Sequence, residues 1–157
     1  LLTGAAPIPV GDRLHIYYRG TARRHNKVPR EYDPRIAADQ DPRTMAIGLA
    51  TLRLDGFASV AASFDGGTLT TTPWRVAGAE LLVNLKADHG QVLVECLGMD
   101  GKPVDGYSRD DCVPLAADRT AAPVRWRERP DLRGLGAQPF QLRFHLHNAR
   151  LYSYRSS

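Results

Sequence analysis

The sequence lacks any apolar run close to the roughly 20 residues that a helix needs to cross a bilayer. Its first residues do not resemble a signal peptide, so no membrane partner is expected, and nothing in the sequence points to a compartment. Cysteine is scarce: Cys96 and Cys112 fit neither the spacing of a zinc site nor a disulfide-dense framework. Cys96 alternates with Val92 and Val94, which predicts a small buried side chain with a free thiol. The alternative is a disulfide between the two cysteines.

A concentration of charge of one sign is also lacking. Lysine and arginine number 21 and aspartate and glutamate 17, for a net charge of +4, and the arginines are spread along the chain. A nucleic-acid partner is therefore not predicted. In the densest basic segment, residues 125–129, alternation along a strand points Trp126 inward and its arginine neighbours outward.

Helical periodicity is absent as well, and the sequence instead alternates apolar and polar residues over short segments. Turn signals separate these segments, among them Asp88-His89-Gly90, which predicts a tight hairpin. The expected strands are 12–20, 51–60, 69–76, 81–87, 91–97, 124–127 and 140–152, the last with a bulge near His147 and Asn148. The pattern predicts an all-β fold, a two-sheet antiparallel β-sandwich of jelly-roll type.

Residues 21–44 differ in kind from the rest of the chain. They carry high charge and three prolines and show no apolar periodicity. This composition predicts a loop or linker. Loops of this length are more often functional or mobile than decorative.

Two segments carry a resemblance to a known family. Gly11–Gly20 reads as Gly-Asp, an alternating apolar run and Tyr-Tyr, and Ile47–Phe57 contains Gly-Leu-Ala-Thr-Leu-Arg-Leu-Asp-Gly-Phe. They resemble the closing propeller strand and the first strand of the following sandwich in the five-bladed β-propeller glycoside hydrolases, the superfamily of invertases and levanases and of arabinanase- and xylosidase-like enzymes. The resemblance implies that residues 1–46 are the end of a propeller blade and a linker, and that residues 47–157 are a carboxy-terminal accessory β-sandwich.

The resemblance also implies a function. The chain would be the tail of an enzyme and would not itself be an enzyme, because both catalytic carboxylates would lie in upstream blades. It would be a non-catalytic accessory sandwich that stabilises an upstream propeller, in the same or a separate chain, and contacts an oligo- or polysaccharide. One alternative is a free-standing sandwich that binds another protein through a sheet face or edge. Another is an autonomous hydrolase with its acids among Asp55, Glu95, Asp110 and Asp111.

Aromatic side chains are the first candidates for carbohydrate contact, because sugar rings stack on them while polar neighbours bind the hydroxyls. The candidates are Tyr107, Arg109, Trp74 and Trp126. Tyr107 lies in a turn-rich segment and is followed by Ser108 and Arg109, which makes it the best exposed candidate. For each aromatic residue the alternative is a packing role in the core.

Four residues near the expected domain junction are candidates for contacts between the domains: Arg53, Asp55, Tyr17 and Tyr18. Arg53 and Asp55 lie two positions apart and would share one face of a strand. This spacing favours an interdomain ion pair over a pair of sugar ligands.

Metal ligands are too few for a site. His145 and His147 have a His-x-His spacing that some zinc sites use, but no third ligand completes the set. The acids Asp105, Asp110 and Asp111 have no calcium-loop spacing. No metal, cofactor, phosphate-binding loop or nucleophile motif is predicted.

Overall fold

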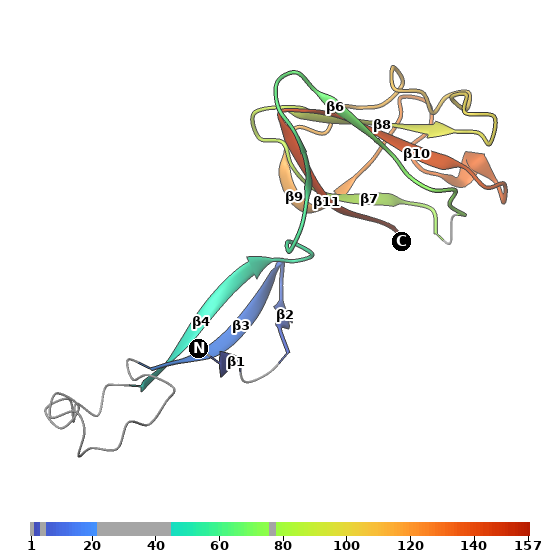
Figure 1. Ribbon diagram of the computed structural model, residues 1–157. Coiled ribbons are helices and arrows are strands. Elements are labelled where there is room, and N and C mark those ends of the chain that lie inside the picture. Colours follow the sequence, from blue (N-terminus) through green and yellow to red (C-terminus); the bar gives the residue numbers. More distant parts are fainter. Residues whose placement is uncertain (1, 4–5, 22–44, 76–77) are drawn as a thin grey trace, which may run out of the picture. The chain divides into compact units, whose positions relative to one another are not determined.

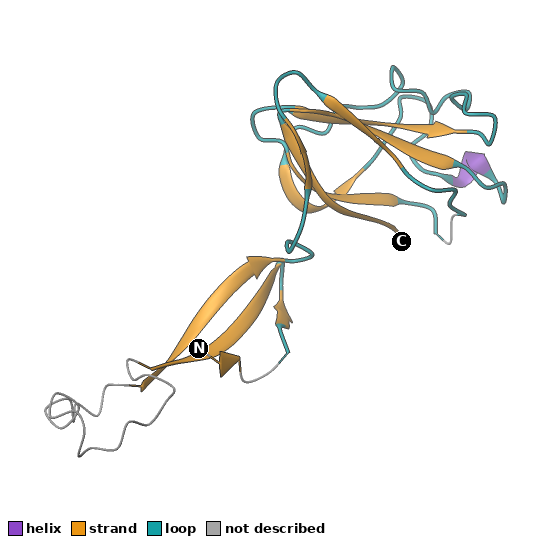
Figure 2. Cartoon of the chain, viewed as in Figure 1, coloured by secondary structure: helices purple, strands orange, loops and turns teal. Residues whose placement is uncertain are grey.

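The computed structural model describes residues 2–3, 6–21, 45–75 and 78–157. The expected linker lies outside the described residues apart from Thr21. Within the described residues every regular element is a strand except η3 (Arg133–Leu135), a single 3-10 turn. All described strand pairs are antiparallel (Figures 1 and 2), which confirms the prediction of an all-β fold.

The chain forms two compact units, Leu1–Leu54 and Asp55–Ser157. The first is a single sheet in which β3 (Arg13–Thr21) pairs with all the others. Its partners are β1 (Leu2–Thr3), β2 (Ile8–Val10) and β4 (Met45–Arg53). Gly11, with a φ of 60°, forms the turn between β2 and β3, where glycine is favoured because it has no Cβ.

The unit boundary differs from the predicted one between residues 46 and 47. The segment expected to open the sandwich is β4, and it pairs with β3 along its whole length, from Arg13 opposite Arg53 to Thr21 opposite Met45. Its hydrogen bonds therefore belong to the first sheet. The chain enters the second unit only after Leu54, whose N–H donates to the Asp12 carbonyl at 2.9 Å.

The second unit is a β-sandwich of two antiparallel sheets (Figure 1). One sheet has the order β6-β10-β8, and the other has the order β5-β11-β7-β9. Their bounds are β5 (Val60–Ala62), β6 (Gly67–Thr70), β7 (Leu81–Lys86), β8 (Gln91–Leu97), β9 (Asp118–Pro123), β10 (Gln141–His147) and β11 (Ala149–Ser156).

The core lies between these two sheets. Alternate residues of β8 and β10, such as Val94 and Phe144, point into it and meet Leu85 of β7 and Leu151 of β11. Each large apolar side chain buried in this way contributes about 1.5–3 kcal/mol. The period of two in the sequence therefore predicted the core faces of these strands correctly.

Two turns were interpreted wrongly because a reversal in the sequence does not say which strands pair. Asp88-His89-Gly90 joins β7 to β8, which lie in different sheets, so it is a crossing between the sheets and not a hairpin. The predicted bulge near His147 is also such a crossing. There Asn148 has a φ of 45°, a conformation that asparagine tolerates, and the chain passes from β10 in one sheet to β11 in the other.

Two other expected strands are shorter or displaced. In the segment expected at 69–76, β6 ends at Thr70, and beyond it Trp74 makes a single bridge to Phe140. In the segment 124–127, Trp126 makes single bridges to Cys112 and Arg129, and the regular strand is β9, which ends before it.

Candidate functional site

Tyr107 is buried, so its identification as the best exposed aromatic was wrong. It is 1% exposed, and its hydroxyl donates to the Asp131 carbonyl at 3.0 Å. Its backbone carbonyl accepts a hydrogen bond from the Cys96 N–H, which fastens the turn-rich segment onto β8. Burial raises the pKa of Tyr107. A turn-rich composition indicated the loop correctly but not that the loop closes one end of the core.

The two tryptophans also pack inside the sandwich. Trp126 points inward, as its alternation with arginine predicted, and its indole N–H donates to the Val94 carbonyl at 2.9 Å. Trp74 is half-buried, and its ring packs edge-on against Phe140 and Tyr154 at centroid distances of 5.8 and 5.7 Å. Of the four sugar-binding candidates, Arg109 is the one whose side chain is exposed.

Arg53 and Asp55 do not share a strand face. β4 ends at Arg53, and Asp55 lies in the turn beyond it with a φ of 54°. The Asp55 carboxylate accepts a hydrogen bond from the Ser153 hydroxyl at 2.8 Å, within the sandwich. The prediction of a shared face failed because the chain turns immediately after Arg53.

Tyr17 and Tyr18 point to opposite faces of the first sheet. Tyr17 is exposed and lies opposite Leu49 of β4. The Tyr18 ring covers Gly48, where a Cβ would collide with it. Glycine at position 48 is thus required by the close approach of the tyrosine ring.

Arg109 lines a hollow on the outer side of the β6-β10-β8 sheet, here called the β10 hollow. Thr68, Leu93 and His145 lie side by side on the three strands and face outward into it. Its volume is about 280 Å³. The full lining is Asp65, Gly66, Gly67, Thr68, Gln91, Leu93, Arg109, His145, Leu146 and His147. The His-x-His pair of β10 therefore lines one hollow, as its alternation requires.

A buried carboxylate supports one side of this hollow. The side chain of Glu95 is 7% exposed, and its Oε1 accepts a hydrogen bond from Arg143 Nη1 at 3.2 Å. The same oxygen lies 2.9 Å from His145 Nε2. A buried carboxylate is stable only when it is paired and hydrogen-bonded. Glu95 meets that requirement, and in return it fixes the orientation of the His145 ring.

An exposed aromatic ring lies beside the hollow. Phe64 is 68% exposed, and its ring packs edge-on against His147 at a centroid distance of 5.7 Å. It belongs to the turn Ser63-Phe64-Asp65-Gly66 before β6 and was missed in the sequence. The signal was a large apolar residue inside a polar turn, where no core position would account for it.

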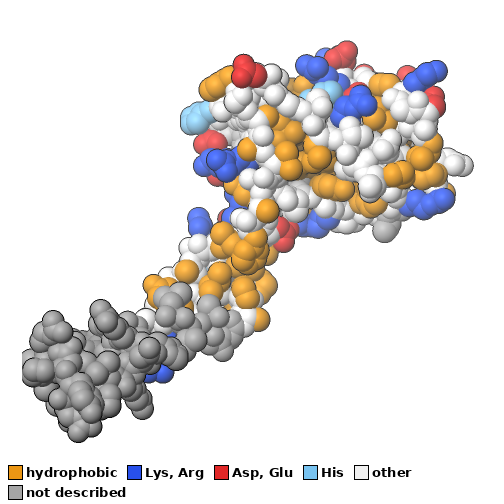
Figure 3. Space-filling view, viewed as in Figure 1, with side chains coloured by type: hydrophobic (Ala, Val, Ile, Leu, Met, Phe, Trp, Pro, Cys, Tyr) orange, Lys and Arg blue, Asp and Glu red, His pale blue; other side chains and the backbone are white. Residues whose placement is uncertain are grey.

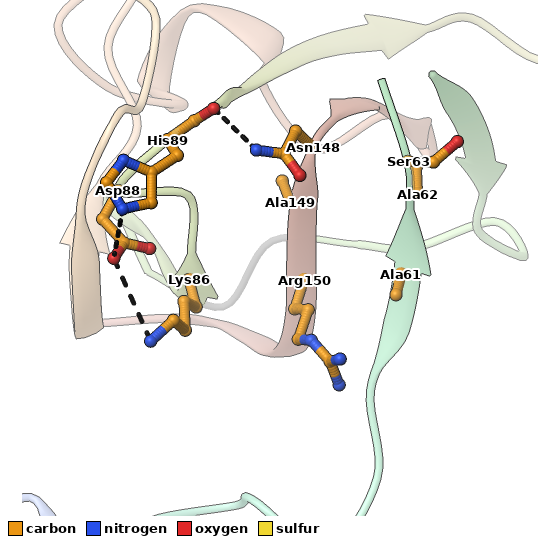
Figure 4. A pocket seen from close by; sticks show the side chains of 9 residues that line it. All are labelled: Ala61, Ala62, Ser63, Lys86, Asp88, His89, Asn148, Ala149 and Arg150. Carbon is orange, nitrogen blue, oxygen red and sulfur yellow. Dashed lines mark hydrogen bonds and ion pairs between the residues drawn. The ribbon is translucent and has the colours of Figure 1, made fainter. Parts of the chain in front are cut away.

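A second hollow, here called the β11 hollow, lies on the other sheet (Figure 4). Its volume is about 520 Å³, and Ala61, Ala62 and Ala149 are among the residues lining it. Its charged groups are mostly paired with one another: Lys86 lies 4.0 Å from Asp88, and His89 lies 3.7 Å from the same carboxylate. Neither hollow has phenylalanine, tyrosine or tryptophan in its lining, but Phe64 packs against His147 of the β10 hollow. The paired charges of the β11 hollow and the ring beside the β10 hollow make the β11 hollow less suited to a sugar ring than the β10 hollow.

Both cysteines are buried and free, which confirms the prediction for Cys96. Burial raises the pKa of both thiols, and that of Cys112 rises to about 11. The Val94 N–H donates to the Cys112 sulfur at 3.2 Å. Both thiols are thus packed inside the core and are held in the protonated form.

Within the described residues, no group of three or more metal-ligating side chains is close enough to hold an ion. Among the same residues no helix is long and apolar enough to cross a bilayer. Comparison with protein-family models, with curated proteins and with solved structures found no match.

Proposed function

We propose that residues 55–157 are a non-catalytic accessory sandwich of a glycoside-hydrolase-like protein. The sandwich is joined through the sheet of β1–β4 to an upstream propeller that it stabilises, and it contacts carbohydrate. One observation carries the proposal: the sheet of β1–β4 has one apolar face, and its other face exposes large apolar side chains beside the polar residues Arg13, His15, Thr51 and Arg53. The family itself is suggested by the resemblance of Gly11–Gly20 and Ile47–Phe57 to propeller hydrolases.

The first face of this sheet leaves its large apolar side chains in water. Tyr17 lies opposite Leu49, and Ile47 lies next to Leu49 along the same face. Their exposures are 46, 47 and 83%. Ile8 and Val10 of β2, 47 and 48% exposed, are on this face as well, because they pair with His15 and Arg13. Figure 3 shows hydrophobic side chains gathered over this part of the chain.

The second face is more uniformly apolar. Leu14 lies opposite Leu52, and Ile16 lies opposite Ala50; Leu14 is buried, at 9% exposed. A sheet that faces water on one side has a polar outer face, whereas here Tyr17, Ile47 and Leu49 interrupt the polar residues of the first face and remain exposed. A propeller blade is covered on both faces, because blades stand radially around a central axis. The exposed apolar residues of the first face therefore support a sheet that packs within a larger β-structure.

The sandwich, in contrast, encloses a core of its own. Its apolar residues form one cluster between two sheets, and the described side chains include no buried polar atom without a partner. It needs no further layer, so its contribution to a larger protein would be support and binding. The β10 hollow, with hydrogen-bonding side chains and a neighbouring aromatic ring, supports contact with carbohydrate.

A double substitution tests the role of the sheet. In the full chain, Ile47→Thr with Leu49→Thr should lower self-association, measured by light scattering, because it removes apolar area from an uncovered face. The melting temperature of the sandwich should stay unchanged. Phe57→Thr is the matched control, since Phe57 is 71% exposed but lies in the other unit. Equal scattering from the parent chain and the double variant would contradict the proposal that the exposed apolar side chains of this sheet are covered in a larger protein.

A hydrolysis assay tests the non-catalytic role. The full chain should not release products from a panel of aryl glycosides and α- and β-linked oligosaccharides. Turnover above that of buffer, abolished by Asp55→Asn or Asp110→Asn, would refute the proposal and favour an autonomous hydrolase.

A further inference from the structure

We infer that the β10 hollow binds a single uncharged sugar ring. This inference rests on the proposed contact with carbohydrate, and it names the site and the class of ligand. It replaces Tyr107 as the centre of the site and retains Arg109.

The size of the hollow indicates one ring. Small-molecule pockets measure about 300–1,000 Å³, and the β10 hollow, at about 280 Å³, lies just below that range. A longer chain would extend beyond the hollow, where Phe64 offers an exposed aromatic surface against His147.

The charges that line the hollow balance. Asp65 and Arg109 are its two side chains of fixed charge, and within the described residues neither forms an ion pair. Beneath them the charge of Glu95 is matched by Arg143. An anionic ligand that approached Arg109 would be repelled by Asp65, and a cationic ligand that approached Asp65 would be repelled by Arg109. Sugar hydroxyls suit both residues, because each hydroxyl donates to a carboxylate or accepts from a guanidinium.

The remaining polar groups extend this pattern. Glu95 holds Nε2 of His145, so Nδ1 is the ring nitrogen left for a ligand. Gln91 offers both a donor and an acceptor, and Thr68 offers a hydroxyl. Leu93 supplies an apolar patch for the carbon face of a sugar ring. Fixed orientation of His145 lowers the entropy lost when the ligand binds.

The test is a titration of the ¹⁵N-labelled full chain, followed by amide shifts, with methyl glycosides of neutral hexoses and pentoses. Glucuronate and galacturonate serve as charged counterparts. One ring with a few hydrogen bonds predicts a dissociation constant on the order of 1 mM. Amides of 64–68, 109 and 145–147 should shift first.

Asp65→Asn and Arg109→Ala should each weaken binding roughly tenfold, since each removes a charged hydrogen-bonding group. Arg150→Ala is the matched control, because Arg150 is also exposed but lines the β11 hollow.

Each contrary outcome has a distinct meaning. Tighter binding of uronates than of neutral glycosides would overturn the inference, as would binding that survives both substitutions. Shifts confined to the β11 hollow would also overturn it, while leaving the proposed contact with carbohydrate in place. A parallel pull-down with insoluble polysaccharides separates the two proposals, because failure to bind any monomeric or polymeric glycan would refute both. An unchanged amide spectrum away from the hollow confirms that each variant is folded.

Discussion

Substitution of Tyr107 separates a packing role from a ligand-binding role. Its ring packs edge-on against Trp126 at a centroid distance of 5.1 Å, and its hydroxyl donates to the Asp131 carbonyl. Tyr107→Phe removes that hydrogen bond and leaves a carbonyl without its partner, at a cost of about 1 kcal/mol. Tyr107→Ala also removes a buried ring and leaves a cavity, for which large-to-small changes of aromatic residues cost about 3–5 kcal/mol.

These losses are large relative to the stability of the domain. A single domain of this size has a free energy of unfolding of about 5–15 kcal/mol. A loss of 1 kcal/mol lowers the melting temperature of a domain of about 100 residues by about 4–8 °C. Tyr107→Phe should therefore melt a few degrees lower, and Tyr107→Ala should lose at least about 12 °C or fail to fold.

Urea unfolding of the full chain measures both variants, with tryptophan emission as the probe because Trp126 touches the substituted ring. Sugar titration of Tyr107→Phe, the milder variant, should give the affinity of the parent chain. A Tyr107→Ala chain that melts with the parent but no longer binds sugar would refute this reasoning and restore an exposed, ligand-stacking tyrosine.

Three further predictions concern the sandwich. Burial raises the pKa of the Cys112 thiol from 9.0 to about 11. Its contribution to the free energy of unfolding, about 3 kcal/mol in all, is therefore complete below pH 9 and is lost as the pH rises to 11. Urea midpoints from pH 8 to 11 should fall more steeply for the parent than for Cys112→Ala. Gly90→Ala should lower the free energy of unfolding by about 1–3 kcal/mol, because a Cβ there would collide with the carbonyl oxygen of His147; a melting temperature equal to the parent's would show that the backbone moves aside. Glu95→Gln should cost about 1–3 kcal/mol and shift the His145 ring resonances, and unchanged resonances would show that the carboxylate does not orient that ring.

The sequence predicted the core better than the connections. Alternation in β8 identified Val94 and Cys96 as inward-facing, because period-two burial is a local property of a strand. Alternation also pointed Trp126 inward correctly. It could not assign β7 and β8 to different sheets, since Asp88-His89-Gly90 shows only that the chain reverses.

The lining of the β10 hollow was predictable only in part. Arg109 was a candidate because it follows Tyr107 in the sequence, but Arg109 lines the hollow whereas Tyr107 is buried in the core. Tyr107 is buried by η3 and the turn before it, which are about 25 residues away along the chain and unrelated to its own segment. The β10 hollow combines the turn at Asp65 with β8, β10 and the loop at Arg109. Only the pairing register places these segments together, and composition does not reveal it.

Hydrogen exchange of the full chain tests most directly the central claim that the sandwich is complete and the β1–β4 sheet needs cover. Amides of β8 and β10 lie in a closed core and should open only on global unfolding. Amides of β3 and β4, in a single sheet that leaves Tyr17, Ile47 and Leu49 exposed, should exchange faster by several orders of magnitude. Equal protection of β3, β4, β8 and β10 would contradict the account, because it would show that the first sheet is stable without a further layer.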